Sequence, residues 1–237
     1  MRRVVIAAVA VLASQVAHAM SFHASPPYLF LGGAVVRSDW EAWEEAMIRF
    51  DGKIEAVVFH NSGGGDSQAG RKIGEDIRKR NLSTVVLGRC SSACANMFLG
   101  GVTRQFAEPQ TGLHTVLGYH GSYNKKTHEM NKKKTGDYFL DMTDGKMRED
   151  FVERFIRLEN RKGLLRFIHP EQRARPTEPL AQLCKGDEER TQRDTTCEKL
   201  EGVDALDKGI VTTWTTRAVP AYPKPVKDKG TYRGWDP

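Results

Sequence analysis

Two short apolar segments, each followed by a turn of small residues and then by a helical pattern, constrain this fold most strongly. The first, 54–59, ends in the glycine-rich turn 60–66, and the second, 84–88, runs directly into 90–94. Apolar runs of this length suit buried strands. Strands that alternate with helices at this spacing form parallel sheets joined by crossover connections. The sequence therefore predicts an α/β domain with a parallel sheet and crossover helices.

The N-terminus has the order of a cleavable secretory signal. Arg2 and Arg3 precede an apolar run over 4–13, and the segment closes on Ala17-His18-Ala19. A positive start, a short apolar stretch and a small-x-small end form the pattern that signal peptidase reads. A buried N-terminal helix is the alternative interpretation. We expect residues 1–19 to be a signal peptide and the mature protein to begin at Met20, in the periplasm or outside the cell.

The remaining chain is long enough for one domain. Removing 19 of the 237 residues leaves 218, which suits a single domain with a sizeable core. We expect this domain over 20–218, followed by an extended tail rich in proline and lysine over 219–237. A membrane-spanning helix needs roughly 20 apolar residues. No segment after the signal approaches this, so we expect no stable membrane insertion.

The charge pattern bears on partners. The formal net charge of +6 is a mild excess, concentrated in the lysine-rich run 124–134. Proteins that bind single-stranded nucleic acid interleave aromatic platforms with their basic groups, and this run contains none. We therefore expect no nucleic-acid partner, and no motif calls for a cofactor or a metal. A peptide or protein substrate, an acidic peptide or an anionic envelope surface suits the expected compartment better.

Four cysteines lie in the expected mature chain: Cys90, Cys94, Cys184 and Cys197. In an oxidising compartment an even number favours disulfides, and four cysteines permit three connectivities. Proximity in sequence favours Cys90–Cys94 and Cys184–Cys197. A zinc site that joins the closer pair to His114 or His120 is the alternative, although the spacing matches no zinc signature.

Two features stand at the carboxyl ends of the predicted parallel strands, where open α/β sheets bind their ligands. The first is the glycine run 63–65, whose backbone N–H groups could face a ligand closely, as an oxyanion hole requires. The second is Ser92, at the positive N-terminal end of a helix. An ordinary turn and a helix N-cap are the structural alternatives.

Together with His120, these segments resemble the motifs of the Clp-type serine proteases. Segment 61–65 is similar to their Asn-Ser-Pro-Gly-Gly turn, and 88–95 to their Gly-x-x-x-Ser-Met-Gly-Ala nucleophile segment. Residues 117–121 resemble their Met-Ile-His-x-Pro segment, and 205–211 their closing helix and strand. The Cys-x-Ser-Ala-Cys variant resembles a group of exported bacterial Clp-protease-like proteins.

The resemblance implies a ClpP/crotonase-like fold and a serine peptidase. Ser92 would be the nucleophile and His120 its general base. The N–H groups of Gly65 and Ala93 would form the oxyanion hole. Ring assembly is common in this family, so the resemblance leaves a homo-oligomer open.

The third catalytic residue departs from the family pattern. The family's aspartate would fall at Cys197, and Asp194 is the substitute that we expect to orient His120, with Glu198 as the other nearby carboxylate. A serine–lysine dyad that uses Lys125 or Lys126 is a different option. A second function also stays open, in which the chain is an inactive pseudo-protease that binds peptides or has a structural role in the cell envelope.

Overall fold

The structure is a computed structural model. It describes residues 19–124, 127, 129, 132–158, 160, 162–173, 175–186, 197–222 and 233–234. Several sequence-based predictions lie outside these residues. They are most of the expected signal peptide, most of the tail 219–237, and the candidates Asp194, Lys125 and Lys126.

The N-terminal half alternates strands and helices as the sequence predicts. In chain order its elements are β1 Ser21–Ser25, β2 Tyr28–Val35, α1 Asp39–Arg49, β3 Ala56–Gly65, α2 Ser67–Lys79, β4 Ser83–Ser91, α3 Ala93–Leu99, β5 Arg104–Phe106 and β6 Val116–Tyr119. The C-terminal half contributes α4 Lys132–Met142, α5 Glu149–Ile156, β7 Leu164–Phe167, the 3-10 turn η1 Pro170–Gln172, β8 Ala181–Cys184, β9 Glu198–Lys199 and β10 Arg233–Gly234.

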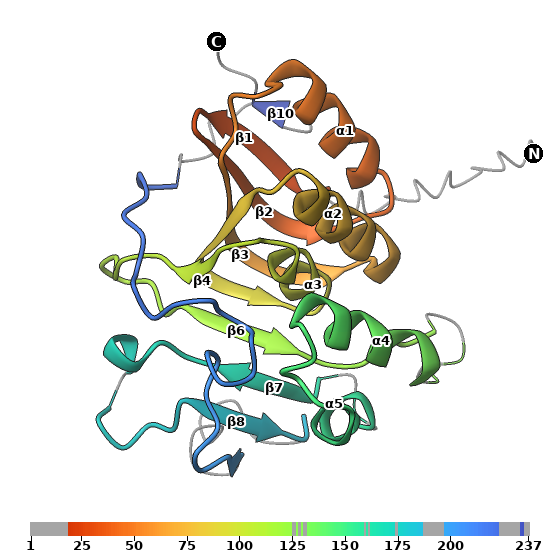
Figure 1. The fold of residues 1–237 in the computed structure, drawn as a ribbon, viewed down its shortest axis with the longest axis vertical. Helices are drawn as coiled ribbons and strands as arrows, with labels where there is room; N and C mark the ends of the chain where they lie inside the picture. The colour runs from red at the N-terminus through yellow and green to blue at the C-terminus, as the bar shows by residue number, and fades with distance from the viewer. Residues whose placement is uncertain are drawn as a thin grey trace, which may run out of the picture.

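One mostly parallel sheet forms the centre of the molecule. Its strand order is β10-β1-β2-β3-β4-β6-β7-β8-β9, with β5 also paired to β4 (Figure 1). Strands β2, β3, β4 and β6 run parallel, whereas β6 to β9 are antiparallel neighbours. The predicted single α/β domain with a parallel sheet and crossover helices is therefore confirmed, and the antiparallel strands extend it beyond the prediction.

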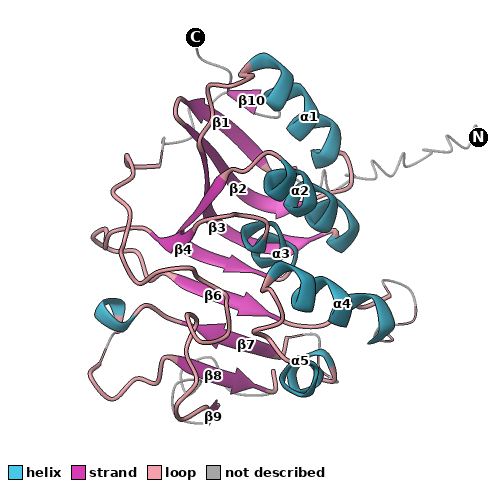
Figure 2. Cartoon of the chain, viewed as in Figure 1, coloured by secondary structure: helices cyan, strands magenta, loops and turns pink. Residues whose placement is uncertain are grey.

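The two faces of the sheet are covered differently. Helices α1 to α5 gather on one face, where side chains such as Trp43, Phe98 and Phe155 form the main core (Figure 2). The other face carries a smaller cluster that includes Phe30 and Leu87. The C-terminal segment 212–222, which contains no helix, covers this cluster. Its residues Val219 and Tyr222 pack against the cluster. None of the helices in the described part of the chain is long and apolar enough to span a membrane.

Small residues allow α2 and α3 to pack closely. A Cβ added to Gly70 would lie 2.7 Å from the carbonyl oxygen of Ala93, and one added to Gly74 would lie 2.9 Å from that of Asn96. Atoms this close would clash, so larger residues at these positions would push the helices apart. The absence of side chains at Gly70 and Gly74 therefore allows α2 to lie directly against α3.

The prediction of a helix and a strand over 205–211 is wrong, because this segment forms a single turn. The Asp204 carboxylate accepts hydrogen bonds from the N–H groups of Leu206 and Asp207, which begins the turn, and Gly209, at φ +65°, ends it. The guanidinium of the buried Arg104 then donates to the carbonyl oxygens of Gly209 and Ile210. The Arg104 guanidinium thus forms the hydrogen bonds to these carbonyl groups that a neighbouring strand would form if the segment were itself a strand.

Two polar segments also contain regular structure. The lysine-rich run 124–134 overlaps the start of α4, whose later residues Tyr138, Phe139 and Met142 are buried. Within the polar region 173–197, Ala181–Cys184 form β8. Pairing with β7 explains this strand, because Leu165 lies opposite Leu183 on the core side of the sheet.

All four cysteines form disulfides, in the pairing that sequence proximity favours. Cys90 and Cys94 are bonded with their Cα atoms 5.4 Å apart, and Cys184 and Cys197 with theirs 4.5 Å apart. Structural disulfides of this kind indicate an oxidising, extracellular type of compartment.

The disulfide Cys184–Cys197 closes the longer interval of the chain, 13 residues against 4. In the chain-entropy model, a closed loop restricts the unfolded chain more when it is longer. We expect Cys184→Ala with Cys197→Ala to lower the free energy of unfolding by about 3 kcal/mol. Urea denaturation would measure this loss. A loss well under about 1 kcal/mol would show that loop closure does not set the contribution of this disulfide.

Candidate active site

Ser92 occupies a strained turn between strand β4 and helix α3. Its φ and ψ are 57° and −123°, which lie outside the regions that residues with a side chain normally adopt. The N–H of Ser92 donates to the carbonyl oxygen of Gly118 on β6 at 2.8 Å, and its carbonyl accepts from the N–H of Asn96 at 3.0 Å. Both ends of the residue are therefore fixed, one to the neighbouring strand and one to the helix.

The disulfide Cys90–Cys94 spans this turn. Cys90 lies in β4 and Cys94 in α3, and both are fully buried, whereas Ser92 between them is partly exposed. The covalent link joins the strand to the helix on either side of the serine. It restricts the turn to conformations that present Ser92 at the carboxyl end of the parallel strands.

The glycine run belongs to the end of strand β3 and touches this turn. Gly64 has φ +86°, and a Cβ added to it would lie 2.6 Å from the Cβ of Ser92 and 2.8 Å from the nitrogen of Ala93. A Cβ on Gly65 would instead meet the backbone of Val35 in β2. The glycines are thus required for the close approach of β3 to both of its neighbours. They continue the strand instead of forming the loop that the sequence suggested.

Ala93 begins helix α3, so its N–H has no acceptor within the helix. The structure therefore brings Gly64, Ser92 and Ala93 into direct contact, and it places Gly65 one residue further along β3. Of the two oxyanion candidates, Ala93 lies next to the serine, and Gly65 lies where β3 meets β2.

His120 follows the last residue of β6, the strand to which Ser92 is hydrogen-bonded. Its Nδ1 lies 2.5 Å from the carbonyl oxygen of Gly121, which can only accept, so Nδ1 carries the proton. In the neutral ring, Nε2 is then the hydrogen-bond acceptor. Burial lowers the pKa of His120 from its ordinary value of 6.5, and the hydrogen bond to Gly121 opposes this shift. The site thus favours the neutral ring, which is the form that acts as a base.

The carboxylates proposed to orient His120 are not beside it in the described residues. Glu198 lies on β9, which β7 and β8 separate from β6, and it forms an ion pair with Arg154. Cys197, at the position of the family's aspartate, is in a disulfide. Asp194 lies outside the described residues, so its role stays a prediction.

No sequence-based prediction gave a role to Arg71, which the structure places close to His120. This side chain on α2 donates to the Ser122 hydroxyl at 3.3 Å, just beyond His120, and its guanidinium lies 5.4 Å from the centre of the Tyr138 ring. Burial lowers the pKa of Arg71, while Tyr138 and Glu75 oppose the shift. Arg71 therefore links α2 to the segment that follows the histidine.

No family model matches the sequence, and no curated protein matches it. A mutant of ClpP1 from Listeria monocytogenes has a similar structure, with 14% identity, a TM-score of 0.49, and coverage of 78% of this chain and 89% of that one. The ClpP catalytic domain from Plasmodium falciparum is 12% identical, with a TM-score of 0.46 and coverage of 83% and 87%. A mutant of a membrane-bound stomatin-specific protease is 12% identical, with a TM-score of 0.42 and coverage of 60% and 72%. The structural neighbours thus include ClpP proteases, the group that the sequence motifs resemble.

The close contact between Gly64 and Ser92 can be tested by substitution. Gly64→Ala adds a Cβ that would lie 2.5 Å from the carbonyl oxygen of Ser91, at a positive φ. We expect a loss of more than about 3 kcal/mol in the free energy of unfolding, from the backbone conformation and the clash together. Gly112→Ala is the matched control, because Gly112 has φ +79° with nothing within 4 Å of the added atom. Thermal unfolding of both variants would measure the difference, and equal losses would contradict the contact.

Proposed function

We propose that this protein is an exported serine hydrolase, of the peptidase type, in which Ser92 is the nucleophile and His120 the general base. The observation that carries the proposal is the strained backbone of Ser92, at φ 57° between a strand and a helix. Serine nucleophiles of hydrolases occupy such sharp strand-to-helix turns, which expose the hydroxyl. Strain of this kind costs about 1–3 kcal/mol and persists where the surrounding structure enforces it.

The sheet register supports a Ser–His pair. Ser91 on β4 lies opposite Gly118 on β6, so Ser92 and His120 follow one and two residues later. Neighbouring strands lie roughly 4.8 Å apart, and the N–H of Ser92 donates to the carbonyl oxygen of Gly118, two residues before His120. Side chains on such neighbours can come within hydrogen-bonding reach.

The proposed reaction is acyl transfer. Nε2 of His120 takes the hydroxyl proton as Oγ of Ser92 attacks a peptide carbonyl, and the N–H groups of Gly65 and Ala93 stabilise the oxyanion. The same proton then passes to the leaving amine as the C–N bond breaks. Water, activated by Nε2, hydrolyses the acyl-enzyme and restores the serine. No metal or cofactor takes part in these steps.

The proposed location is the periplasm or the exterior of the cell. Two disulfides support an oxidising compartment, and the order of residues 1–19 supports a cleaved secretory signal. An intact mass that begins at Met20, measured on protein from the cell envelope, would check this location.

The uncharged carbonyl group of Gly121, which contacts the His120 ring, favours a second candidate function. A carbonyl such as that of Gly121 fixes the tautomer, but it lacks the full negative charge with which a carboxylate stabilises the protonated ring. A pseudo-protease that binds peptides without cleaving them would have the same geometry. We therefore expect catalysis to be slow, and Asp194 stays the proposed carboxylate.

A fluorophosphonate probe distinguishes the two functions. We expect slow, stoichiometric labelling of Ser92 in the mature protein, located by mapping the labelled peptide, because the probe requires an activated serine. Ser92→Ala should abolish the labelling, and His120→Ala should slow it by about 10²-fold or more. Asp194→Asn should also slow it, and an unchanged rate would leave the Gly121 carbonyl as the orienting group. No labelling after prolonged incubation would exclude the hydrolase and leave the peptide-binding function.

The pH dependence of the same reaction tests the environment of His120. Only the neutral ring accepts the serine proton, and burial lowers the pKa below 6.5. The labelling rate should therefore fall as the pH decreases, with its midpoint at the lowered pKa, below 6.5. Rates measured between about pH 4.5 and 8 would define the midpoint. A midpoint above 6.5 would show that charged neighbours, and not burial, control this histidine.

A further inference from the structure

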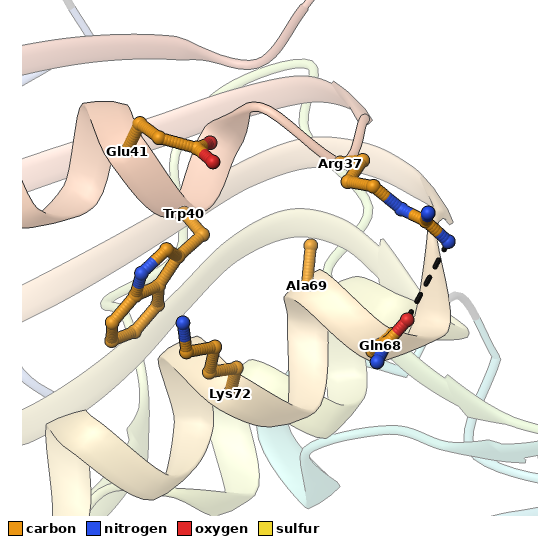
Figure 3. Close-up of a pocket in the computed structure, with 6 residues that line it drawn as sticks. All are labelled: Arg37, Trp40, Glu41, Gln68, Ala69 and Lys72. Atoms are coloured by element: carbon orange, nitrogen blue, oxygen red, sulfur yellow. Dashed lines mark hydrogen bonds between the residues drawn. The ribbon is translucent and has the colours of Figure 1, made fainter.

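A small pocket lies between the N-terminal ends of α1 and α2, outside the site described above (Figure 3). It holds about 240 Å³, with the buried methyl group of Ala69 at its base. Trp40 and Glu41 line it from α1, Gln68 and Lys72 line it from α2, and Arg37 lines it from the loop that precedes α1. Two cations therefore border a shallow apolar base.

Both cations are held by neighbouring side chains. The ammonium of Lys72 lies 3.8 Å from the centre of the Trp40 ring, a cation–π contact that orients the side chain over the pocket. The guanidinium of Arg37 donates to the Gln68 side chain at 3.5 Å. The close contact of Lys72 reduces the side-chain freedom that a ligand would otherwise have to restrict, whereas the long hydrogen bond of the exposed Arg37 restricts that side chain less.

The cations keep hydrogen-bonding capacity for a ligand. The ion pair of Arg37 with Asp66 is long, at 3.9 Å, and 81% of the Arg37 side chain is exposed. An ammonium has three N–H donors, and contact with a ring face leaves others available to solvent or ligand. The carboxylate of Glu41 on α1 also lines the pocket, and its negative charge repels an anion there. The arrangement suits one carboxylate seated between Arg37 and Lys72 over Ala69.

The walls of the pocket are fixed to each other and to the Ser92 turn. The indole N–H of Trp43 on α1 donates to Asp76 on α2 at 2.8 Å, so the two helices keep their spacing. Ala69 forms the base of the pocket, while its neighbour Gly70 packs against Ala93, the residue after Ser92. The pocket thus lies about one helix diameter, roughly 10 Å, from the serine. An extended peptide covers that distance in about three residues.

We propose that this pocket binds an aspartate or glutamate side chain of a peptide, about three residues from the bond that lies at Ser92. The proposal rests on the proposed function for the position of the scissile bond. Its binding chemistry stands on the pocket itself. The protein therefore selects acidic peptides.

Binding to the Ser92→Ala variant tests this without requiring catalysis. The probes are fluorescein-labelled, C-terminally amidated hexapeptides of alanine and serine, with one glutamate or one glutamine at each position in turn. We expect fluorescence anisotropy to show about fivefold to tenfold tighter binding with glutamate at one position. A glutamine peptide with a free C-terminal carboxylate separates a side-chain carboxylate from a chain terminus.

Charge variants of the pocket provide the controls. Arg37→Gln and Lys72→Gln should each weaken binding of the glutamate peptide about threefold to fivefold, with little effect on the glutamine peptide. Glu41→Gln should strengthen it by about twofold to threefold, which general loss of structure cannot do. Lys79→Gln, on the last turn of α2, is a matched change of charge away from the pocket and should have no effect.

Four outcomes would overturn the proposal. They are equal binding of the glutamate and glutamine peptides, a preference that survives Arg37→Gln with Lys72→Gln, equally tight binding of the free-acid glutamine peptide, and binding of neither peptide. A failure of the proposed hydrolase function would give a different result. Ser92 would not be labelled by the fluorophosphonate probe, while the preference for the glutamate peptide would remain.

Discussion

The backbone of Ser92 is the constraint on which the site depends. A residue with a side chain at φ 57° and ψ −123° costs free energy, and three separate contacts stabilise it here. They are the hydrogen bond to Gly118, the hydrogen bond from Asn96 and the disulfide Cys90–Cys94. Because these contacts reach β4, β6 and α3, the serine keeps its position only while the centre of the sheet is intact.

Close backbone packing extends this constraint across α2. Gly64 lets β3 approach Ser92, and Gly70 lets α2 approach Ala93, so the serine turn lies between a strand and a helix that have no side chains at the contact. The same helix carries Arg71 toward Ser122 and turns Lys72 toward Trp40. One short helix thus connects the segment after His120, the serine turn and the cationic pocket. A displacement of α2 would alter all three together.

Much of the central fold could be predicted from sequence because its signals are local. The helix Ser67–Lys79 follows a strand and a capping aspartate, Asp66, and both cysteine pairs are close in sequence. The antiparallel strands could not be predicted in this way, since Leu164–Phe167 becomes a strand through pairing with distant partners. Segment 205–211 resembles the closing helix and strand of the Clp-type proteases in sequence, but Arg104 donates to its carbonyl groups and it forms a turn. The cationic pocket joins α1 to α2 through side-chain contacts that no sequence spacing reveals.

The uncharged Gly121 carbonyl beside His120 and the pocket between α1 and α2 both affect the expected rate of peptide cleavage. In the proposed reaction, the Gly121 carbonyl alone would orient the imidazole without balancing the positive charge that develops on it, so the chemical step would have less electrostatic stabilisation than a carboxylate such as Asp194 would give. Binding energy from a remote part of the substrate can offset this by positioning the reacting carbonyl against Ser92. A carboxylate between Arg37 and Lys72 would supply such energy through α2, which packs directly on the serine turn. In the proposed mechanism, the carbonyl partner of His120 would account for slow general reactivity and the pocket for selection of acidic peptides, because a substrate bound at both places would keep its carbonyl against Ser92 for longer.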